Sequence, residues 1–171
     1  MKLTGYQAPQ VDPRETRELR AQVEEFNSEY CAVLDGGELE QWPDFFVQDC
    51  LYRVTSRENA QANLPVGLVY CEGRAMLHDR AVAINRTQMF APRSLLHVCG
   101  NVRIMSAEGR DGFAAQTNFI LLQTLVESPT TIHLAGRYYD QFVRVDGRLK
   151  LKERQVVYDT TIIATDVVYP V

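Results

Sequence analysis

The second half of the chain consists of four long segments in which apolar and polar residues alternate, and these segments limit the folds open to it. They cover residues 95–107, 113–127, 131–145 and 148–158. Alternation with a period of two places successive side chains on opposite faces, so each segment is predicted to be a β-strand. The connections are short, and the last is Asp146-Gly147, a pair that tight hairpins favour because both positions tolerate positive φ. We therefore predict a four-stranded antiparallel meander.

The first half is predicted to be mainly helical. Asp12 can cap a helix that begins at Pro13 and ends at Gly36-Gly37. Its apolar face is formed by residues spaced three or four apart, namely Leu19, Val23, Phe26, Tyr30 and Val33. A second short helix is expected over residues 38–47, with Leu39, Trp42, Phe45 and Phe46 turned inward. Short strands over 50–55 and 67–72 and a third helix between Gly73 and Pro92 complete this half.

A sheet that buries one face needs a cover, and the three helices supply it. Strands this long are expected to coil or bulge, with Gly100 and Gly136 as candidate bends. The sequence thus predicts an α+β roll, a curved antiparallel sheet cupped around three helices. Residues 1–11 are expected to form a flexible arm and residues 12–171 a single domain.

Composition excludes several classes of function. The 18 basic and 22 acidic residues give a net charge of −4, which argues against a nucleic-acid or anionic-membrane surface. No apolar run approaches the roughly 20 residues of a membrane helix, and the N-terminus has no apolar core of a secretory signal. The four cysteines are widely spaced, so reduced thiols and a cytoplasmic location are expected.

A metal site is not expected in this chain. The histidines, His78, His97 and His133, lack ligand spacing, and His97-Val98-Cys99 is the one close pair of histidine and cysteine. Neither a nucleophilic triad in order nor a phosphate-binding glycine loop is present.

Acid–base chemistry is an alternative, because rolls of this type also house isomerases and dehydratases. The candidate groups around a cone-shaped cavity are Asp49, Tyr52, His97, Asn101, Tyr138 and Asp140. The competing interpretation makes His97 a hydrogen-bonded sheet residue or a subunit contact. The helical spacing of Trp42, Phe45 and Phe46 favours core packing over a ligand pocket.

The segment 160–171 is rich in β-branched and apolar residues up to Val171. Terminal segments are normally polar and frayed, so this one either completes the fold or is buried against another chain. We favour the interpretation that this segment serves in part as an arm that packs against another subunit of an oligomer.

Taken together, the residues from about 20 to 171 resemble the small (β) subunit of aromatic-ring-hydroxylating dioxygenases, the Rieske non-haem iron oxygenases. Several stretches carry the resemblance in order: Glu40–Phe46, Asp49–Val54, Met76–Arg80, Arg93–His97 with Asn101-Val102, Gly136–Asp140 and Leu149–Asp159. Within the family, the sequence looks most similar to the terephthalate and salicylate branch.

The resemblance implies a cystatin-like, ketosteroid-isomerase-like roll without a catalytic centre. It also implies assembly with a large α subunit, commonly three α with three β, in which the β subunits associate as a trimer and α carries the Rieske [2Fe-2S] cluster and the mononuclear Fe(II). The expected reaction is oxidation of a mononuclear aromatic, with a carboxylate favoured. Candidate interface residues are Arg80, His97, Arg137, Arg154 and Tyr169. Two alternatives remain: a stand-alone isomerase or dehydratase that uses His97 and Asp49, and a module that only binds a small aromatic near Trp42.

Overall fold

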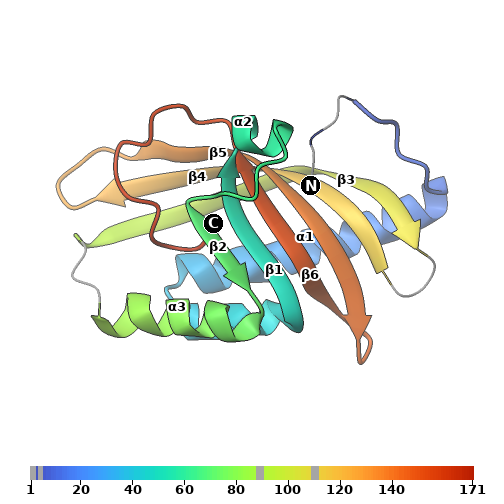
Figure 1. The fold of residues 1–171 in the computed structure, drawn as a ribbon, viewed down its shortest axis with the longest axis horizontal. Helices are drawn as coiled ribbons and strands as arrows, with labels where there is room; N and C mark the ends of the chain where they lie inside the picture. Colours follow the sequence, from blue (N-terminus) through green and yellow to red (C-terminus); the bar gives the residue numbers. More distant parts are fainter. Residues whose placement is uncertain (1–2, 4–5, 88–90, 109–111) are drawn as a thin grey trace.

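The structure is a computed structural model that describes residues 3, 6–87, 91–108 and 112–171. A six-stranded sheet in the order β2-β1-β6-β5-β4-β3 curls around the long helix α1, which crosses one of its faces (Figure 1). The apolar core lies between α1 and the inner face of the sheet. The predicted α+β roll is confirmed.

Helix α1 (Pro13–Asp35) begins where the sequence predicts. The Asp12 carboxylate accepts from the backbone N–H groups of Arg14 and Glu15 over 2.8 and 3.4 Å, and so satisfies two donors of the first turn. At the other end, Gly37 takes a φ of 79°, which a residue without a Cβ adopts at little cost. The helix buries Leu19, Val23 and Tyr30.

The predicted meander is present. Its strands are β3 (Arg93–Glu108), β4 (Gly112–Leu125), β5 (Thr131–Val145) and β6 (Arg148–Tyr158), each antiparallel to the next. Asp146 and Gly147 join β5 to β6 with φ values of 51° and 75°, as the hairpin prediction requires. The predicted connection 108–112 includes residues 109–111, which lie outside the described residues.

The region between α1 and the meander differs in detail from the prediction. The second helix is a 3-10 helix, η1 (Leu39–Phe45), and Phe46 already belongs to strand β1 (Phe46–Ser56). Pro43 has no N–H to donate, so an α-helix through it would lose a hydrogen bond. Helix α2 (Arg57–Gln61) was not predicted, because five residues are too few to reveal a helical period.

The sheet is also not wholly antiparallel. Strand β1 pairs antiparallel with β2 (Val69–Glu72) but parallel with β6. Helix α3 (Arg74–Thr87) connects β2 to the meander. The predicted end of this helix, close to Pro92, includes residues 88–90, which lie outside the described part of the chain.

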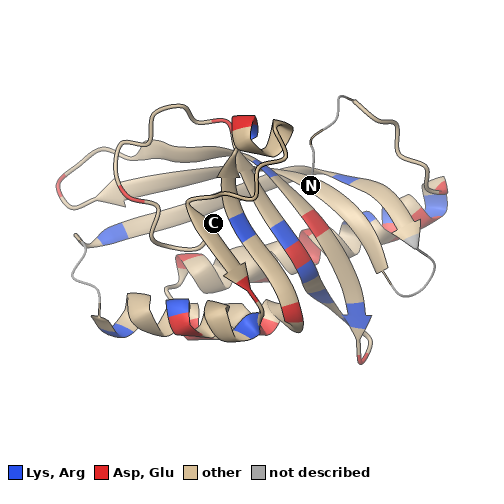
Figure 2. Ribbon diagram, in the orientation of Figure 1, with Lys and Arg blue, Asp and Glu red and all other residues tan. Residues whose placement is uncertain are grey.

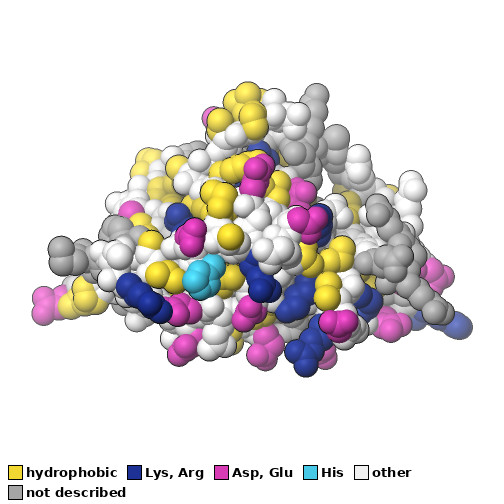
Figure 3. All heavy atoms as spheres, turned by 60° about the horizontal axis from the view of Figure 1, so that its bottom comes forward, with side chains coloured by type: hydrophobic (Ala, Val, Ile, Leu, Met, Phe, Trp, Pro, Cys, Tyr) yellow, Lys and Arg dark blue, Asp and Glu magenta, His cyan; other side chains and the backbone are white. Residues whose placement is uncertain are grey.

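Charged residues occur along β6 and its neighbours β1 and β5 (Figure 2). On the face seen in Figure 3, acidic and basic side chains are interspersed with apolar ones. Among the described residues, no helix is both long and apolar enough to cross a membrane.

Of the two glycines predicted as bends, Gly100 lies at a register shift and Gly136 at a close approach of two strands. The register of β3 against β4 shifts between Gly100 and Arg103, and Asn101 there has a φ of 53°. At Gly136 the strands β5 and β6 approach so closely that a Cβ would lie 2.1 Å from the Val157 carbonyl oxygen. Such a contact cannot be relieved by a side-chain rotation, because the obstructing atom belongs to the backbone.

Gly136→Ala is therefore expected to lower the free energy of unfolding by about 2–3 kcal/mol, measured by urea denaturation. Gly100→Ala is the matched control, because no atom lies within 4 Å of its added Cβ. Its effect is expected to stay within about 0.5 kcal/mol. Equal effects of the two substitutions would contradict this account.

Candidate functional site

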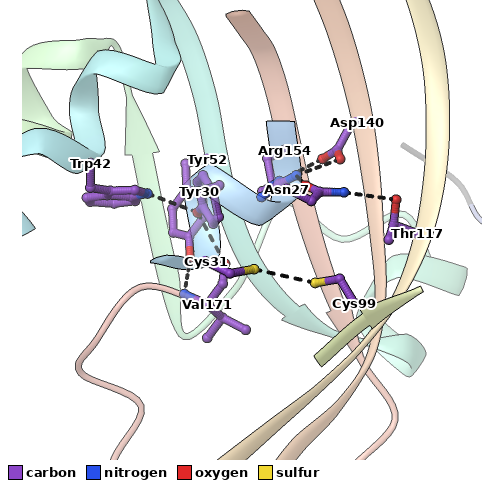
Figure 4. Close-up of polar contacts among 10 residues, drawn as sticks. All are labelled: Asn27, Tyr30, Cys31, Trp42, Tyr52, Cys99, Thr117, Asp140, Arg154 and Val171. Atoms are coloured by element: carbon purple, nitrogen blue, oxygen red, sulfur yellow. Dashed lines mark hydrogen bonds and ion pairs between the residues drawn. The ribbon is translucent and has the colours of Figure 1, made fainter. Parts of the chain in front are cut away.

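A fully buried ion pair lies at the centre of the roll. Arg154 on β6 and Asp140 on β5 face each other across the strand ladder. The Nε and Nη2 groups of Arg154 donate to the two carboxylate oxygens over 2.9 and 2.8 Å, and both side chains are 0% exposed (Figure 4). Burial alone would lower the pKa of Arg154, but the Asp140 carboxylate holds this pKa well above its usual value. The guanidinium therefore stays charged.

The same guanidinium ties α1 to the sheet. Its Nη2 also donates to Oδ1 of Asn27 over 2.7 Å, and Nδ2 of Asn27 donates to the Thr117 hydroxyl on β4 over 3.4 Å. The rings of Tyr30 and Tyr138 lie on the guanidinium, each with its centroid 4.2 Å from Cζ. Desolvated cation–π contacts of this kind are stabilising. The cluster joins α1, β4, β5 and β6.

A second cluster of polar side chains surrounds Val171, which is fully buried in the core. The indole N–H of Trp42 donates to the Tyr30 hydroxyl over 2.9 Å. The Tyr30 and Tyr52 hydroxyls both donate to the main-chain oxygen of Val171 over 3.3 Å, and the Val171 N–H donates to Tyr52 over 2.9 Å (Figure 4). Burial raises the pKa of Tyr30 to about 12 and that of Tyr52 well above its usual value. Both phenols are therefore protonated donors at neutral pH.

A third group lies where α1 crosses β3. Nδ1 of His97 is 2.6 Å from a carboxylate oxygen of Asp35, and the backbone N–H of His97 also donates to that carboxylate. The Sγ atoms of Cys31 and Cys99 are 3.6 Å apart (Figure 4). These four residues line a hollow of about 360 Å³.

The structure does not bring the proposed acid–base pair together. The Asp49 side chain is 79% exposed and pairs with Lys152, which lowers the pKa of its carboxyl. His97 is instead a buried partner of Asp35. Asn101 is exposed at the β3 bulge, while Tyr52, Tyr138 and Asp140 belong to the two core clusters. The arrangement does not favour the isomerase or dehydratase alternative.

Of the predicted interface residues, Arg154 requires a correction, because it is enclosed by its own chain. Strict alternation would place Arg154 on the same face as Lys150 and Lys152. The register of β5 against β6 shifts between Gln141 and Phe142, and Leu151 and Glu153 are the paired residues on either side of the shift. The extra residue, Lys152, moves Arg154 to the buried face.

The other interface candidates occupy different environments. His97 has a fully buried side chain. Arg80 donates to the main-chain oxygens of Val167 and Val168, and the Tyr169 ring lies 5.6 Å from the guanidinium carbon of Arg93. These contacts hold the segment 160–171 against its own chain, and Val171 completes the core. Arg137 remains about one-third exposed and pairs with Asp159.

Asn27, Asp35 and Val171 were missed as members of polar clusters. Asp35 follows Cys31 by about one helical turn, so the two share a face of α1, and His97 precedes Cys99 by two strand positions, so these share a face of β3. Once α1 is known to cross β3, these spacings indicate that the His97–Asp35 and Cys31–Cys99 contacts lie side by side. Among the described residues, no group of three or more His, Cys, Asp or Glu side chains could hold a metal ion.

The fold and these clusters define an α+β roll whose centre is occupied by its own polar and aromatic side chains. A solved structure of a proposed scytalone dehydratase from Novosphingobium aromaticivorans has the same fold, with a TM-score of 0.69 at 21% identity, over 89% of this chain and 92% of that one.

Comparison with known proteins identifies the family. The family model of the ring hydroxylating beta subunit matches residues 31–165. The chain is 34% identical to the anthranilate 1,2-dioxygenase small subunit of Burkholderia cepacia, over 83% of this chain and 88% of the relative. It is also 34% identical to the terephthalate 1,2-dioxygenase terminal oxygenase component subunit beta 1 of a Comamonas species, over 87% and 96%.

A solved β subunit of a proposed aromatic-ring-hydroxylating dioxygenase from N. aromaticivorans matches with a TM-score of 0.82 and 36% identity, over 91% of this chain and 98% of that one. The chain belongs to the ring-hydroxylating dioxygenase β-subunit family.

Replacing Asp140 by Asn is expected to lower the free energy of unfolding by about 3–5 kcal/mol, because it leaves Arg154 buried without a countercharge. Chemical denaturation followed by circular dichroism measures this loss. Asp49→Asn removes a carboxylate from an exposed pair and is expected to leave stability nearly unchanged. The double variant Asp140→Leu/Arg154→Met is expected to recover most of the loss, and a loss as large as that of Asp140→Asn would contradict this explanation.

Proposed function

We propose that the chain is a non-catalytic structural β subunit of a multicomponent aromatic-ring-hydroxylating dioxygenase and supports the assembly of large α subunits. The observation that carries this proposal is the family match over residues 31–165. The arrangement of the core supports it, because the large polar and aromatic side chains at the centre of the roll are fully buried. These side chains are Tyr30, Trp42, Tyr52 and Arg154.

In the proposed holoenzyme, the α subunit holds the Rieske [2Fe-2S] cluster and the mononuclear Fe(II), and three α assemble with three β. The names of the anthranilate and terephthalate relatives support a mononuclear aromatic carboxylate as substrate. We place the assembly in the cytoplasm, and the four free cysteines are compatible with reducing conditions there.

The outer face of the meander offers a surface for the α subunit. An apolar patch, called the outer-face patch below, extends across three adjacent strands and consists of Leu96, Val98, Ile120, Leu122 and Ile132. Leu96 lies opposite Leu122, which lies opposite Ile132. Arg137, on β5, borders the patch beside Asn118. An apolar centre with an arginine at its rim is typical of subunit interfaces.

The proposed function is tested by expressing the chain with and without the co-encoded large subunit. We expect the two chains to copurify with a mass close to three of each, and iron to be found only in the preparation that contains α. A stable solitary monomer with no affinity for the large subunit, or tightly bound iron in the chain alone, would overturn the proposal.

Ile132→Asp is expected to weaken copurification with the α subunit at least tenfold, because a charge would be buried within the apolar contact. Val145→Asp is the matched control, since Val145 is an exposed apolar residue at the opposite end of the same strand. Circular dichroism confirms that each variant is folded. Equal binding by both variants would exclude the outer-face patch as the contact.

A further inference from the structure

Val171 is held in the core in the way that a ligand is held. Two phenol hydroxyls from different elements, Tyr30 on α1 and Tyr52 on β1, converge on one main-chain oxygen (Figure 4). The side chain of Val171 is 0% exposed and packs within the apolar core. The contacts are therefore those of a small apolar group with one oxygen acceptor and one N–H donor, since the Val171 N–H also donates to Tyr52.

Other residues of the segment 160–171 form contacts with β3 and β4, away from the tyrosine pair. The Asp166 carboxylate forms two hydrogen bonds with Arg93, of 2.7 and 3.1 Å, and the Thr165 hydroxyl donates to Gln123 over 3.1 Å. Ile162 is 83% exposed. The segment thus lies on the surface along much of its length, and Val171 is the residue that enters the tyrosine pair.

We propose that Tyr30 and Tyr52 form a binding site for a small apolar molecule with a carboxylate or carbonyl oxygen, and that Val171 occupies this site in cis. This proposal does not depend on the role as a dioxygenase subunit. It concerns an internal site that opens only when the terminal segment withdraws.

The surrounding chemistry selects an acceptor. Trp42 Nε1 already donates to Tyr30, which leaves the Tyr30 hydroxyl proton directed at the ligand position. Arg80 and Arg154 both place positive charge near Tyr52, and the Nε of Arg80 has no hydrogen-bond partner among the described residues. A ligand oxygen carrying negative charge is favoured in such a field. The bulk of the ligand must be apolar, because the valine side chain packs against core residues.

The experiment compares the full chain with a variant that lacks residues 167–171. The probes are 3-methylbutanoate, which imitates the side chain and oxygen of Val171, and a synthetic pentapeptide with the sequence of residues 167–171. Trp42 is the only tryptophan and contacts Tyr30, so its fluorescence reports binding. We expect both probes to bind the shortened variant at least tenfold more tightly than the full chain, where the tethered segment competes at an effective concentration of about millimolar.

Toluene separates the hydrogen bonds from the cavity. An apolar cavity of about 150 Å³ is known to bind benzene, so the shortened variant is expected to bind toluene as well. Adding Tyr52→Phe should weaken 3-methylbutanoate about tenfold, the equivalent of one hydrogen bond, and leave toluene unchanged. Ile162→Ala, in the exposed part of the segment, should leave the full chain without measurable affinity for either acid probe.

Circular dichroism establishes whether the shortened variant is folded. If it is not, Asp166→Ala in the full chain removes the contact with Arg93 and should allow 3-methylbutanoate to bind measurably. A folded shortened variant that binds toluene but neither acid probe would overturn the proposal. The proposal would also be overturned if the full chain bound the acid probes as tightly as the shortened variant does. If the shortened variant is unfolded, the proposal would be overturned by a failure of Asp166→Ala to bind 3-methylbutanoate.

Discussion

The buried Arg154–Asp140 pair is the constraint around which the rest of the core is arranged. An ion in a low-dielectric interior costs several kcal/mol unless its partners are well placed, so the pair contributes little net stability by itself. Its requirements are nevertheless specific: β5 and β6 must pair in one register, and Asn27 must face the guanidinium from α1. The rings of Tyr30 and Tyr138 both lie against the guanidinium. One side chain thereby fixes the position of the helix on the sheet.

How far the sequence predicts this fold depends on whether local chemistry or long-range pairing decides each element. Helix α1 and the β5–β6 hairpin follow from Asp12, Gly37 and Asp146-Gly147, which act on their immediate neighbours. The parallel pairing of β1 with β6 has no local signal, because it joins strands about a hundred residues apart. The 3-10 geometry of η1 and the brevity of α2 likewise escape a periodicity argument.

The site was harder to predict than the fold, and Arg154 gives the physical reason. The residues from Arg148 to Lys152 alternate as a strand with one solvated face would, and a single extra residue reverses the faces beyond them. Glu153, which stands where the alternation calls for an apolar residue, is the local mark of this bulge. His97 and Asp35 illustrate a second limit, since their contact depends on the angle at which α1 crosses β3.

These features together explain why a roll of this type can serve as a subunit. Its interior is filled by its own groups: the ion pair occupies the centre, and Val171 accepts from two buried tyrosine hydroxyls whose protons would otherwise have no acceptor. An unpaired buried hydroxyl is costly, so the terminal segment is bound by the same need that would hold a ligand. While Val171 occupies the tyrosine pair, other molecules contact the chain at its surface. The outer-face patch on β3, β4 and β5 places apolar side chains there. The Arg154 cluster joins α1 to β4, β5 and β6, and so fixes the arrangement of two of the three strands that carry this patch.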